Sequence, residues 1–323
     1  MDIVRTLASA LVGVPIALLY AVLVRLTFSS DKPFSLFLST MTCGFLFLVP
    51  LAIGALTVRL APSKLRKSLA YAICAPWISI LIVAVGSAAF YIEAAICIVM
   101  AIPLFLVFAS AGGIWVHAKN KDINKPVQNT MLGIILLAPY IVTPLEMRIP
   151  EYDSYRLVEN QIVINSSADR VWENIVSIPP INVEEQGFSV FHLLGVPKLL
   201  EAQLSHQGIG GTRIVNFDNG LSFIETITGW DEFKSVSFSI RPNNESSAPA
   251  PFDMVGGRYF AVTAMNYWIE DTGDGRVLLH LRSKHRLTTH FNAYAGLWTD
   301  FMLVNLQSYV LQMIKTRAEG SFP

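Results

Sequence analysis

The sequence predicts an α+β protein in two parts. The first is an all-helical transmembrane bundle of about five spans, and the second is a curved antiparallel sheet wrapped on a long C-terminal helix. Residues 1–150 are dominated by apolar runs of the length that crosses a bilayer as a helix, about 20 residues. After Pro150 the pattern changes to short alternating strands, and it ends in an amphipathic stretch from about Asn292 to Glu319.

The composition excludes several classes of protein. Of 323 residues, 53% are hydrophobic and 15% are charged, whereas soluble globular chains are about 25% charged. The high hydrophobic share and the low charged share also exclude a disordered chain, because disordered chains are charged and poor in apolar residues. Residues 1–150 hold 11 Lys and Arg against 5 Asp and Glu, and residues 151–323 hold 13 against 19. Neither half carries the dense basic patch of a nucleic-acid-binding protein, so no nucleic-acid partner is expected.

The N-terminal half contains apolar runs for five membrane spans. One run carries a single charge, Glu93, and is long enough for two helices with a turn near Phe90–Glu93. The last run is uncharged but contains Pro139 and Pro144. The runs are Ile3–Val24, Pro33–Val58, Ser68–Val116 (two helices) and Pro126–Leu145.

Basic residues in the connecting loops predict the orientation of these spans. Lys and Arg in short loops favour the cytoplasmic side. The loops after the second and fourth spans hold Arg59, Lys64, Arg66, Lys67, Lys119, Lys121 and Lys125. Five spans then give a cytoplasmic N-terminus and an extracytoplasmic C-terminal half. If Pro126–Leu145 does not cross, the C-terminal half lies in the cytoplasm.

The predicted domain boundaries follow the change in composition. We expect a transmembrane domain over residues 1–148, a polar linker over 149–156 and an α+β domain over 157–323. Within the last domain, alternating apolar residues predict strands and a 3.6-residue period predicts helices. The predicted elements are a strand Val158–Ile164, a helix Arg170–Val176, strands Leu200–Gln207, Thr212–Phe217, Ser222–Thr228, Val236–Ile240, Arg258–Glu270 and Arg276–Leu287, and a helix Asn292–Glu319.

One hairpin register decides where two charged residues lie. Asn219-Gly220 is a strong signal for a two-residue hairpin turn. Such a turn pairs residues 214 and 225, which puts Arg213 on the opposite face of the sheet from Glu225. We therefore expect no ion pair between them.

Several segments of the C-terminal half resemble a known family. They are Ile162–Trp172 (IVINSSADRVW), Gly208–Arg213 (GIGGTR), Phe223–Glu225 with Trp230–Glu232, and the stretch from Leu297-Trp298 to Glu319. Together they are similar to the START-like helix-grip (SRPBCC) superfamily, in particular to bacterial members of the polyketide cyclase/dehydrase and lipid transport type. The resemblance implies a helix-grip fold with a cavity for an apolar ligand. Since the similar proteins are bacterial, the predicted spans give the expectation of a multi-pass protein of the bacterial inner (plasma) membrane. It does not imply one reaction.

Three residues are candidates for the wall of such a cavity. Glu225 and His285 are titratable side chains on apolar strand faces, so each could bind a ligand or act as an acid or base. Trp298, at the start of the long helix, could cap the cavity mouth. For each residue the alternative is a purely structural role in the core, at the rim or in a salt bridge.

Metal, cofactor and phosphate sites find no support in the sequence. The three cysteines, Cys43, Cys74 and Cys97, lie in apolar runs and form no CxxC pair, and the histidines lack metal-ligand spacing. Gly208–Gly211 lacks the Lys-Ser/Thr of a phosphate loop and fits a turn between strands. We expect neither a metal nor a cofactor.

Three functional hypotheses remain open. The first is a membrane-anchored binding or carrier protein for a hydrophobic small molecule or lipid, with the lipid bilayer as its second partner. The second is a cyclase- or dehydratase-type enzyme that acts on an apolar substrate, with His285 and Glu225 as acid and base. The third is a membrane sensor or assembly factor whose spans bind a protein partner.

Overall fold

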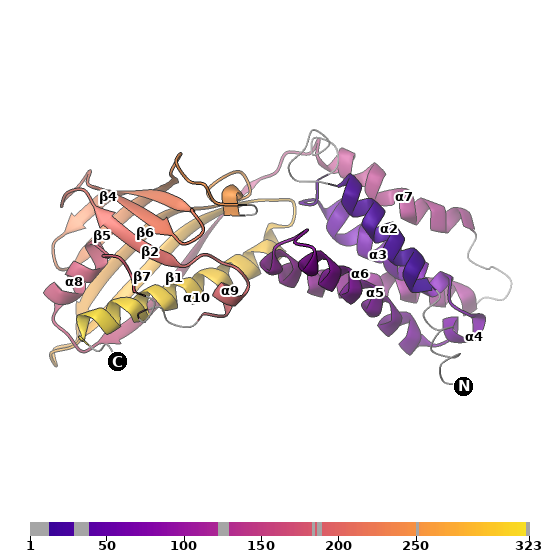
Figure 1. Cartoon of the computed structure of the whole chain (residues 1–323), viewed down its shortest axis with the longest axis horizontal. Coiled ribbons are helices and arrows are strands. Elements are labelled where there is room, and N and C mark those ends of the chain that lie inside the picture. The colour runs from indigo at the N-terminus through magenta and orange to yellow at the C-terminus, as the bar shows by residue number, and fades with distance from the viewer. Residues whose placement is uncertain are drawn as a thin grey trace. The chain divides into compact units, whose positions relative to one another are not determined.

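The computed structural model describes residues 13–28, 39–121, 129–182, 185, 189–249 and 252–320. The chain divides into two compact units, Met1–Glu151 and Tyr152–Pro323, which are described separately (Figure 1). The starts of the first, second and fifth predicted spans lie outside the described residues.

The first unit is helical throughout its described part. The apolar run from Ser68 to Val116 divides into two helices at the predicted turn. These two helices have the length and hydropathy of membrane spans, and three further apolar helices are shorter. The elements are α2 (Gly13–Thr27), η2 (Gly44–Leu48), α3 (Val49–Arg59), α4 (Ser63–Arg66), α5 (Leu69–Ala89), α6 (Ala95–Lys121) and α7 (Asn129–Glu146). Five full-length spans therefore stay a prediction.

Glycines allow helices α3 and α6 to pack with their backbones in contact. A Cβ atom on Gly54 would lie 1.9 Å from the Ala109 carbonyl oxygen, and one on Gly112 would lie 2.0 Å from the Leu51 carbonyl oxygen. No side chain fits at either position. Such close approach through small residues is typical of helix pairs in membranes. Gly86 on α5 has no heavy atom within 4 Å of its Cβ position.

Hydrogen bonds fix the directions of α2, α3 and α7. The Glu146 carboxylate accepts hydrogen bonds from the backbone N–H groups of Cys43 (2.7 Å) and Gly44 (2.9 Å), so α7 ends beside the start of η2 and α3. The Tyr20 hydroxyl donates to the Leu136 carbonyl, and the Thr27 and Tyr140 hydroxyls lie 2.9 Å apart. Helix α7 therefore runs antiparallel to α3 and parallel to α2.

The second unit is an antiparallel sheet with a long helix. Among the described residues, seven strands form one sheet in the order β1-β7-β6-β5-β4-β3-β2, and neighbouring strands are antiparallel. The strands are β1 (Asp153–Ile164), β2 (Leu199–Leu204), β3 (Thr212–Phe217), β4 (Ser222–Asp231), β5 (Ser235–Pro242), β6 (Phe260–Asp271) and β7 (Val277–Thr288). The helices are α8 (Ala168–Val176), α9 (Val190–Leu193), η4 (Phe252–Met254) and α10 (Asn292–Ala318).

Helix α10 extends along the sheet (Figure 1) and is held to β1 and β7 by polar side chains. The Arg156 guanidinium on β1 forms an ion pair with Asp300. Lys315 donates to the Val163 carbonyl oxygen at 2.9 Å. The Gln307 amide donates to the Val158 carbonyl oxygen at 3.1 Å. These contacts are spread along the helix, so its position over the sheet is fixed by more than hydrophobic packing.

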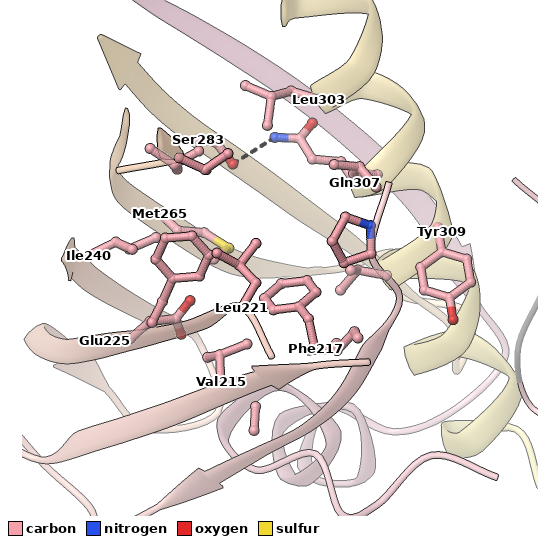
Figure 2. Close-up of a pocket in the computed structure, with 18 of the residues that line it drawn as sticks. Val215, Phe217, Leu221, Glu225, Ile240, Met265, Ser283, Leu303, Gln307 and Tyr309 are labelled. Carbon is pink, nitrogen blue, oxygen red and sulfur yellow. Dashed lines mark hydrogen bonds between the residues drawn. The ribbon is translucent and has the colours of Figure 1, made fainter. Parts of the chain in front are cut away.

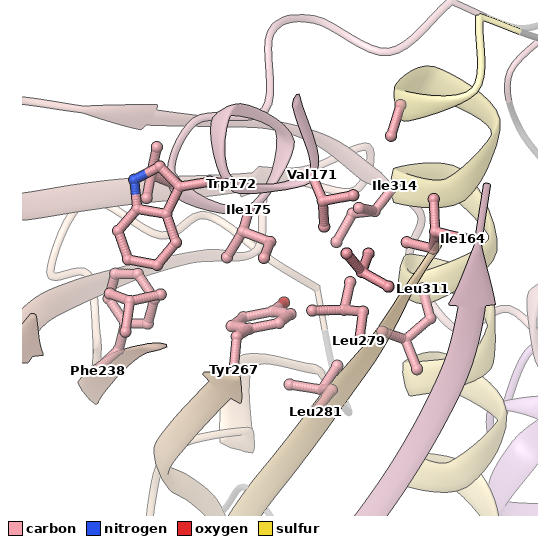
Figure 3. Packing of buried hydrophobic residues seen from close by; sticks show 14 of the residues in the cluster. Ile164, Val171, Trp172, Ile175, Phe238, Tyr267, Leu279, Leu281, Leu311 and Ile314 are labelled. Carbon is pink, nitrogen blue, oxygen red and sulfur yellow. The ribbon is translucent and has the colours of Figure 1, made fainter. Parts of the chain in front are cut away.

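The main core lies where α8, the sheet and one end of α10 meet. Figure 3 shows Trp172 and Ile175 of α8 packed near Tyr267 of β6, with Leu311 and Ile314 of α10 beside the β7 leucines. All five side chains are at most 3% exposed. Burial of these large side chains is the main source of stability for a unit of this size.

This topology is the helix-grip arrangement that the sequence predicts for the C-terminal half. Besides shifts of up to three residues at other element ends, two details differ from the prediction. Strand β1 begins at Asp153, inside the segment expected to be a linker, because residues Asp153–Ile164 pair with β7 over its whole length. The short elements α9 and η4 were not predicted, since a single turn of helix has no periodic signal.

Candidate functional site

A cavity of about 240 Å³ lies within the second unit, between the sheet and α10. We call it the sheet–helix cavity. Its wall is mostly hydrocarbon, supplied by strands β2 to β7, α10 and the connecting loops. Figure 2 shows Val215, Phe217 and Ile240 from the strands facing Leu303 on the helix. A wall of this kind holds an apolar molecule because it offers contact area and few polar groups.

The alternation of β3 explains which side chains enter the cavity. Arg213, Val215 and Phe217 belong to the lining, whereas Ile214 is 45% exposed on the other face. Successive side chains of a strand point to opposite faces. The two faces of β3 therefore provide matched positions, Val215 inside and Ile214 outside, for testing the cavity.

Arg213 and Glu225 form a buried ion pair at the cavity wall, which contradicts the expectation that they lie on opposite faces. They are register partners on β3 and β4. Arg213 Nε and Nη2 lie 2.7 and 2.5 Å from Glu225 Oε2. Arg213 is 2% exposed and Glu225 is 4% exposed. Burial removes both charges from water, which costs free energy. The attraction between the two side chains offsets that cost.

The length of the hairpin loop accounts for the wrong expectation. The Phe217 N–H donates to the Leu221 carbonyl at 2.9 Å, so three residues, 218–220, form the loop instead of two. Gly220 has a φ of +83°, the left-handed conformation that three-residue loops require. One extra loop residue shifts the register by one, and a shift of one moves a side chain to the other face.

Two aromatic side chains complete the surroundings of Arg213. Its guanidinium lies over the Phe238 ring, 4.3 Å from the ring centroid, and Nη1 donates to the Ile175 carbonyl oxygen. Burial alone would lower the pKa of Arg213, but the Glu225 charge and the Tyr267 hydroxyl raise it. Burial also raises the pKa of Tyr267 to about 12, so its hydroxyl is protonated at neutral pH.

The α10 side of the cavity has its own polar contact. The Gln307 Nε2 group donates to Ser283 Oγ at 2.9 Å (Figure 2). Because Nε2 also donates to a backbone carbonyl, which can only accept, the orientation of the amide is fixed. Two polar atoms here, Gln307 Oε1 and the Tyr309 hydroxyl oxygen, are buried and have no hydrogen-bond partner in the described residues. Burial raises the pKa of Tyr309.

His285 faces inward, as its strand pattern predicts, but it does not line the sheet–helix cavity. It is 0% exposed, and its Nε2 lies 3.1 Å from Thr299 Oγ1 and 3.5 Å from Asp300 Oδ1. Burial lowers the pKa of His285, and the Asp300 charge opposes this effect in part. The residue therefore connects β7 to α10 as a neutral side chain.

Trp298 also lies outside the cavity lining. It is half-buried on α10 and interacts with Tyr294. Of the three candidate residues, the structure places only Glu225 in the cavity wall. Arg213, Tyr267 and Gln307 belong to the same wall, and no local sequence signal identified them, because the fold brings them together from β3, β6 and α10.

The described residues contain no group of three or more His, Cys, Asp or Glu side chains that could hold a metal ion. The Gly208–Gly211 segment is a turn between β2 and β3 in which Gly208 and Gly210 have positive φ angles, which fits the structural alternative to a phosphate loop.

Comparisons with known proteins give distant likenesses. No protein-family description and no curated protein matches the chain. Among solved structures, truncated norcoclaurine synthase from Thalictrum flavum is 11% identical over 52% of this chain and 94% of that chain, with a TM-score of 0.32. A structural-genomics protein from Nitrosospira multiformis is 17% identical over 50% and 96%, with a TM-score of 0.31. Ara h 8.0201 is 9% identical over 51% and 98%, with a TM-score of 0.31. At these values the likenesses support no conclusion about ligand or activity.

Proposed function

We propose that this chain is a membrane-anchored binding or carrier protein for a hydrophobic small molecule. The observation that carries the proposal is the sheet–helix cavity, about 240 Å³ in volume with a mostly hydrocarbon wall. Cavities lined mostly by hydrocarbon side chains bind apolar molecules. The enzyme hypothesis has weaker support, because His285 and Glu225 do not line one cavity.

The apolar helices of the first unit support the anchor. Helices α5 and α6 have the length and hydropathy of membrane spans. At 1.5 Å per residue, the 18 residues of α7 reach about 27 Å, close to the thickness of a bilayer core of about 30 Å. An anchor holds the cavity close to the bilayer, where apolar compounds concentrate.

The helix directions support a fifth crossing and an extracytoplasmic second unit. Helix α3 ends at Arg59, next to the basic loop expected in the cytoplasm. Helix α7 runs antiparallel to α3, since Glu146 binds the N–H groups that start η2. It therefore runs away from the cytoplasm, as α2 does. The side of the second unit is tested by fusing a phosphatase, active only outside the cytoplasm, or a fluorescent protein, active only inside it, after residue 323. We expect an active phosphatase fusion and a dark fluorescent fusion. A silent phosphatase with a bright fluorescent fusion would refute the extracytoplasmic location.

The binding function is tested by filling the cavity. In Val215→Trp the indole occupies the cavity, whereas in Ile214→Trp the same indole lies on the outer face of β3. Both full-length proteins are purified in parallel, and co-purifying apolar compounds are measured by mass spectrometry. We expect apolar compounds to co-purify with the wild-type protein and with Ile214→Trp. They should be absent from Val215→Trp. Equal amounts in all three would show that they are bulk lipid, and the proposal would fail.

A further inference from the structure

Ser283 places a hydroxyl group in the mostly apolar wall of the sheet–helix cavity. It lies on the inward face of β7, is 4% exposed and belongs to the cavity lining. Its neighbours in that lining are apolar: Met265 is its register partner on β6, and Leu281 is the preceding inward residue of β7. A polar group buried among apolar side chains is costly unless it is hydrogen-bonded. The Ser283 hydroxyl therefore needs partners for both its oxygen and its hydrogen.

Gln307 determines that the Ser283 oxygen acts as an acceptor. Gln307 Nε2 lies 3.1 Å from the Val158 carbonyl oxygen and 2.9 Å from Ser283 Oγ. A backbone carbonyl can only accept, so the atom beside it is the amide nitrogen, whose two hydrogens serve both oxygens. Figure 2 shows the bond to Ser283. The Ser283 oxygen is thus satisfied by α10, and its own hydrogen is left to be donated.

The hydrogen of the Ser283 hydroxyl has no acceptor among the described residues. Gln307 Oε1 does not accept it, because this atom has no hydrogen-bond partner in the part of the chain that the structure describes. Since Ser283 lines the cavity, a molecule bound there can be the acceptor. The arrangement on β7 and α10 therefore favours a ligand with an acceptor at this point of the wall.

The lining restricts that acceptor to a neutral group of moderate size. Arg213 and Glu225 balance each other's charge, so an ionised carboxylate would bring an unbalanced charge into an apolar cavity. A carbonyl oxygen accepts hydrogen bonds without carrying a charge. A cavity of about 150 Å³ binds benzene, so one of about 240 Å³ encloses about ten carbons.

We propose that the ligand is a neutral carbonyl compound, a ketone or an ester, whose carbonyl oxygen accepts a hydrogen bond from the Ser283 hydroxyl and whose enclosed part has about ten carbons. Gln307 is a positioning residue, because it binds the Ser283 oxygen and leaves the hydrogen for the ligand. This inference rests on the proposed binding function and adds the class of ligand to it.

The test compares tetralin with 1-tetralone, which have the same carbon skeleton and differ by a carbonyl in place of a CH₂ group. Full-length protein in lipid nanodiscs is dialysed to equilibrium against each probe, with protein-free nanodiscs of equal lipid content as the blank. The measured quantity is the dissociation constant of tetralin divided by that of 1-tetralone. Ser283→Ala should lower this ratio about fivefold, the usual net effect of one neutral hydrogen bond, and leave tetralin binding nearly unchanged. The matched control Ser239→Ala, exposed on β5 and outside the lining, should keep the wild-type ratio.

Two further measurements make the assignment independent of one variant. In Ser283→Ala the Gln307 amide keeps a buried N–H group without an acceptor, which can unfold the unit. The paired variant Ser283→Ala/Gln307→Met removes that group and should show the same lowered ratio. In the wild-type protein, infrared spectroscopy of 1-tetralone with an isotope-labelled carbonyl should show a lower stretching frequency than in the apolar solvent hexane, because a hydrogen bond weakens the C=O bond.

The outcomes separate this inference from the proposed function. An unshifted carbonyl band, or a ratio in the folded Ser283 variants equal to that of the wild type, would overturn the carbonyl proposal and leave the binding function intact. No binding of either probe to the wild type above the blank would overturn both.

Discussion

Removing one partner of the Arg213–Glu225 pair is the sharpest test of the interior of the second unit. Both side chains are almost completely buried, at 2% and 4% exposure. In Arg213→Met the buried carboxylate loses its counter-ion, and in Glu225→Gln the buried guanidinium does. Breaking a buried pair in this way typically destabilises a protein by about 3–5 kcal/mol. We expect a loss of this size from each single variant.

The double variant, Arg213→Met/Glu225→Gln, distinguishes an ion pair from two independent side chains. With both charges removed, no buried charge is left alone, and replacing a buried pair by uncharged side chains is often close to neutral. We therefore expect the double variant to be more stable than either single variant. The difference from additivity measures the coupling between the two residues.

Hydrogen exchange of the full-length protein gives the required resolution. Amides of β3 and β4, within Thr212–Asp231, report the opening of this part of the sheet separately from the helices of the first unit. A loss of 3–5 kcal/mol accelerates their exchange by about two to four orders of magnitude. Glu159→Gln, which breaks an exposed pair with Arg282, is the control and should change little. Single variants that behave like this control, or a double variant equal to their sum, would refute the buried pair.

Two further predictions concern other parts of the chain. Because burial lowers the pKa of His285, the folded state binds a proton less readily than the unfolded chain, and stability should fall as the pH drops below about 6.5. In hydrogen-exchange measurements His285→Gln should reduce this fall and leave the share of His192, whose pKa burial also lowers. The exposed His206→Gln should leave the fall unchanged. Gly54→Val should abolish the close packing against Ala109 and lower the yield of monodisperse protein in size-exclusion chromatography, whereas Gly86→Val, with open space at its Cβ position, should not.

Most strands and helices of the second unit could be predicted from the sequence, because local patterns determine them. The prediction for the last helix, Asn292–Glu319, ends one residue beyond α10, and the prediction for the last strand, Arg276–Leu287, is displaced by one residue from β7. Alternation also identified the inward face of β7, on which Leu281 and His285 are buried. The bounds of an element and the face that it buries depend on the element itself. The spacing of apolar residues along the sequence therefore predicts both.

The candidate site was predictable only in part, because it depends on how elements meet. Glu225 could be found from the sequence, since it shares a strand face with apolar residues. Its partner could not, because the pairing of Arg213 depends on whether the hairpin loop has two residues or three. Gln307 reaches Ser283 across 24 positions of sequence, and neither residue carries a local signal of that contact.

The polar contacts of α10 explain why the cavity persists. A void costs about 24 cal/mol for each Å³, so an empty cavity of about 240 Å³ costs about 6 kcal/mol, which is comparable to the whole stability of many domains. A helix held by apolar contacts alone would shift toward the sheet and close such a space. Here the Arg156–Asp300 pair and the hydrogen bonds from Gln307 and Lys315 hold α10 at fixed points on β1. The fold therefore keeps a costly space open, and an apolar molecule bound there would recover part of that cost.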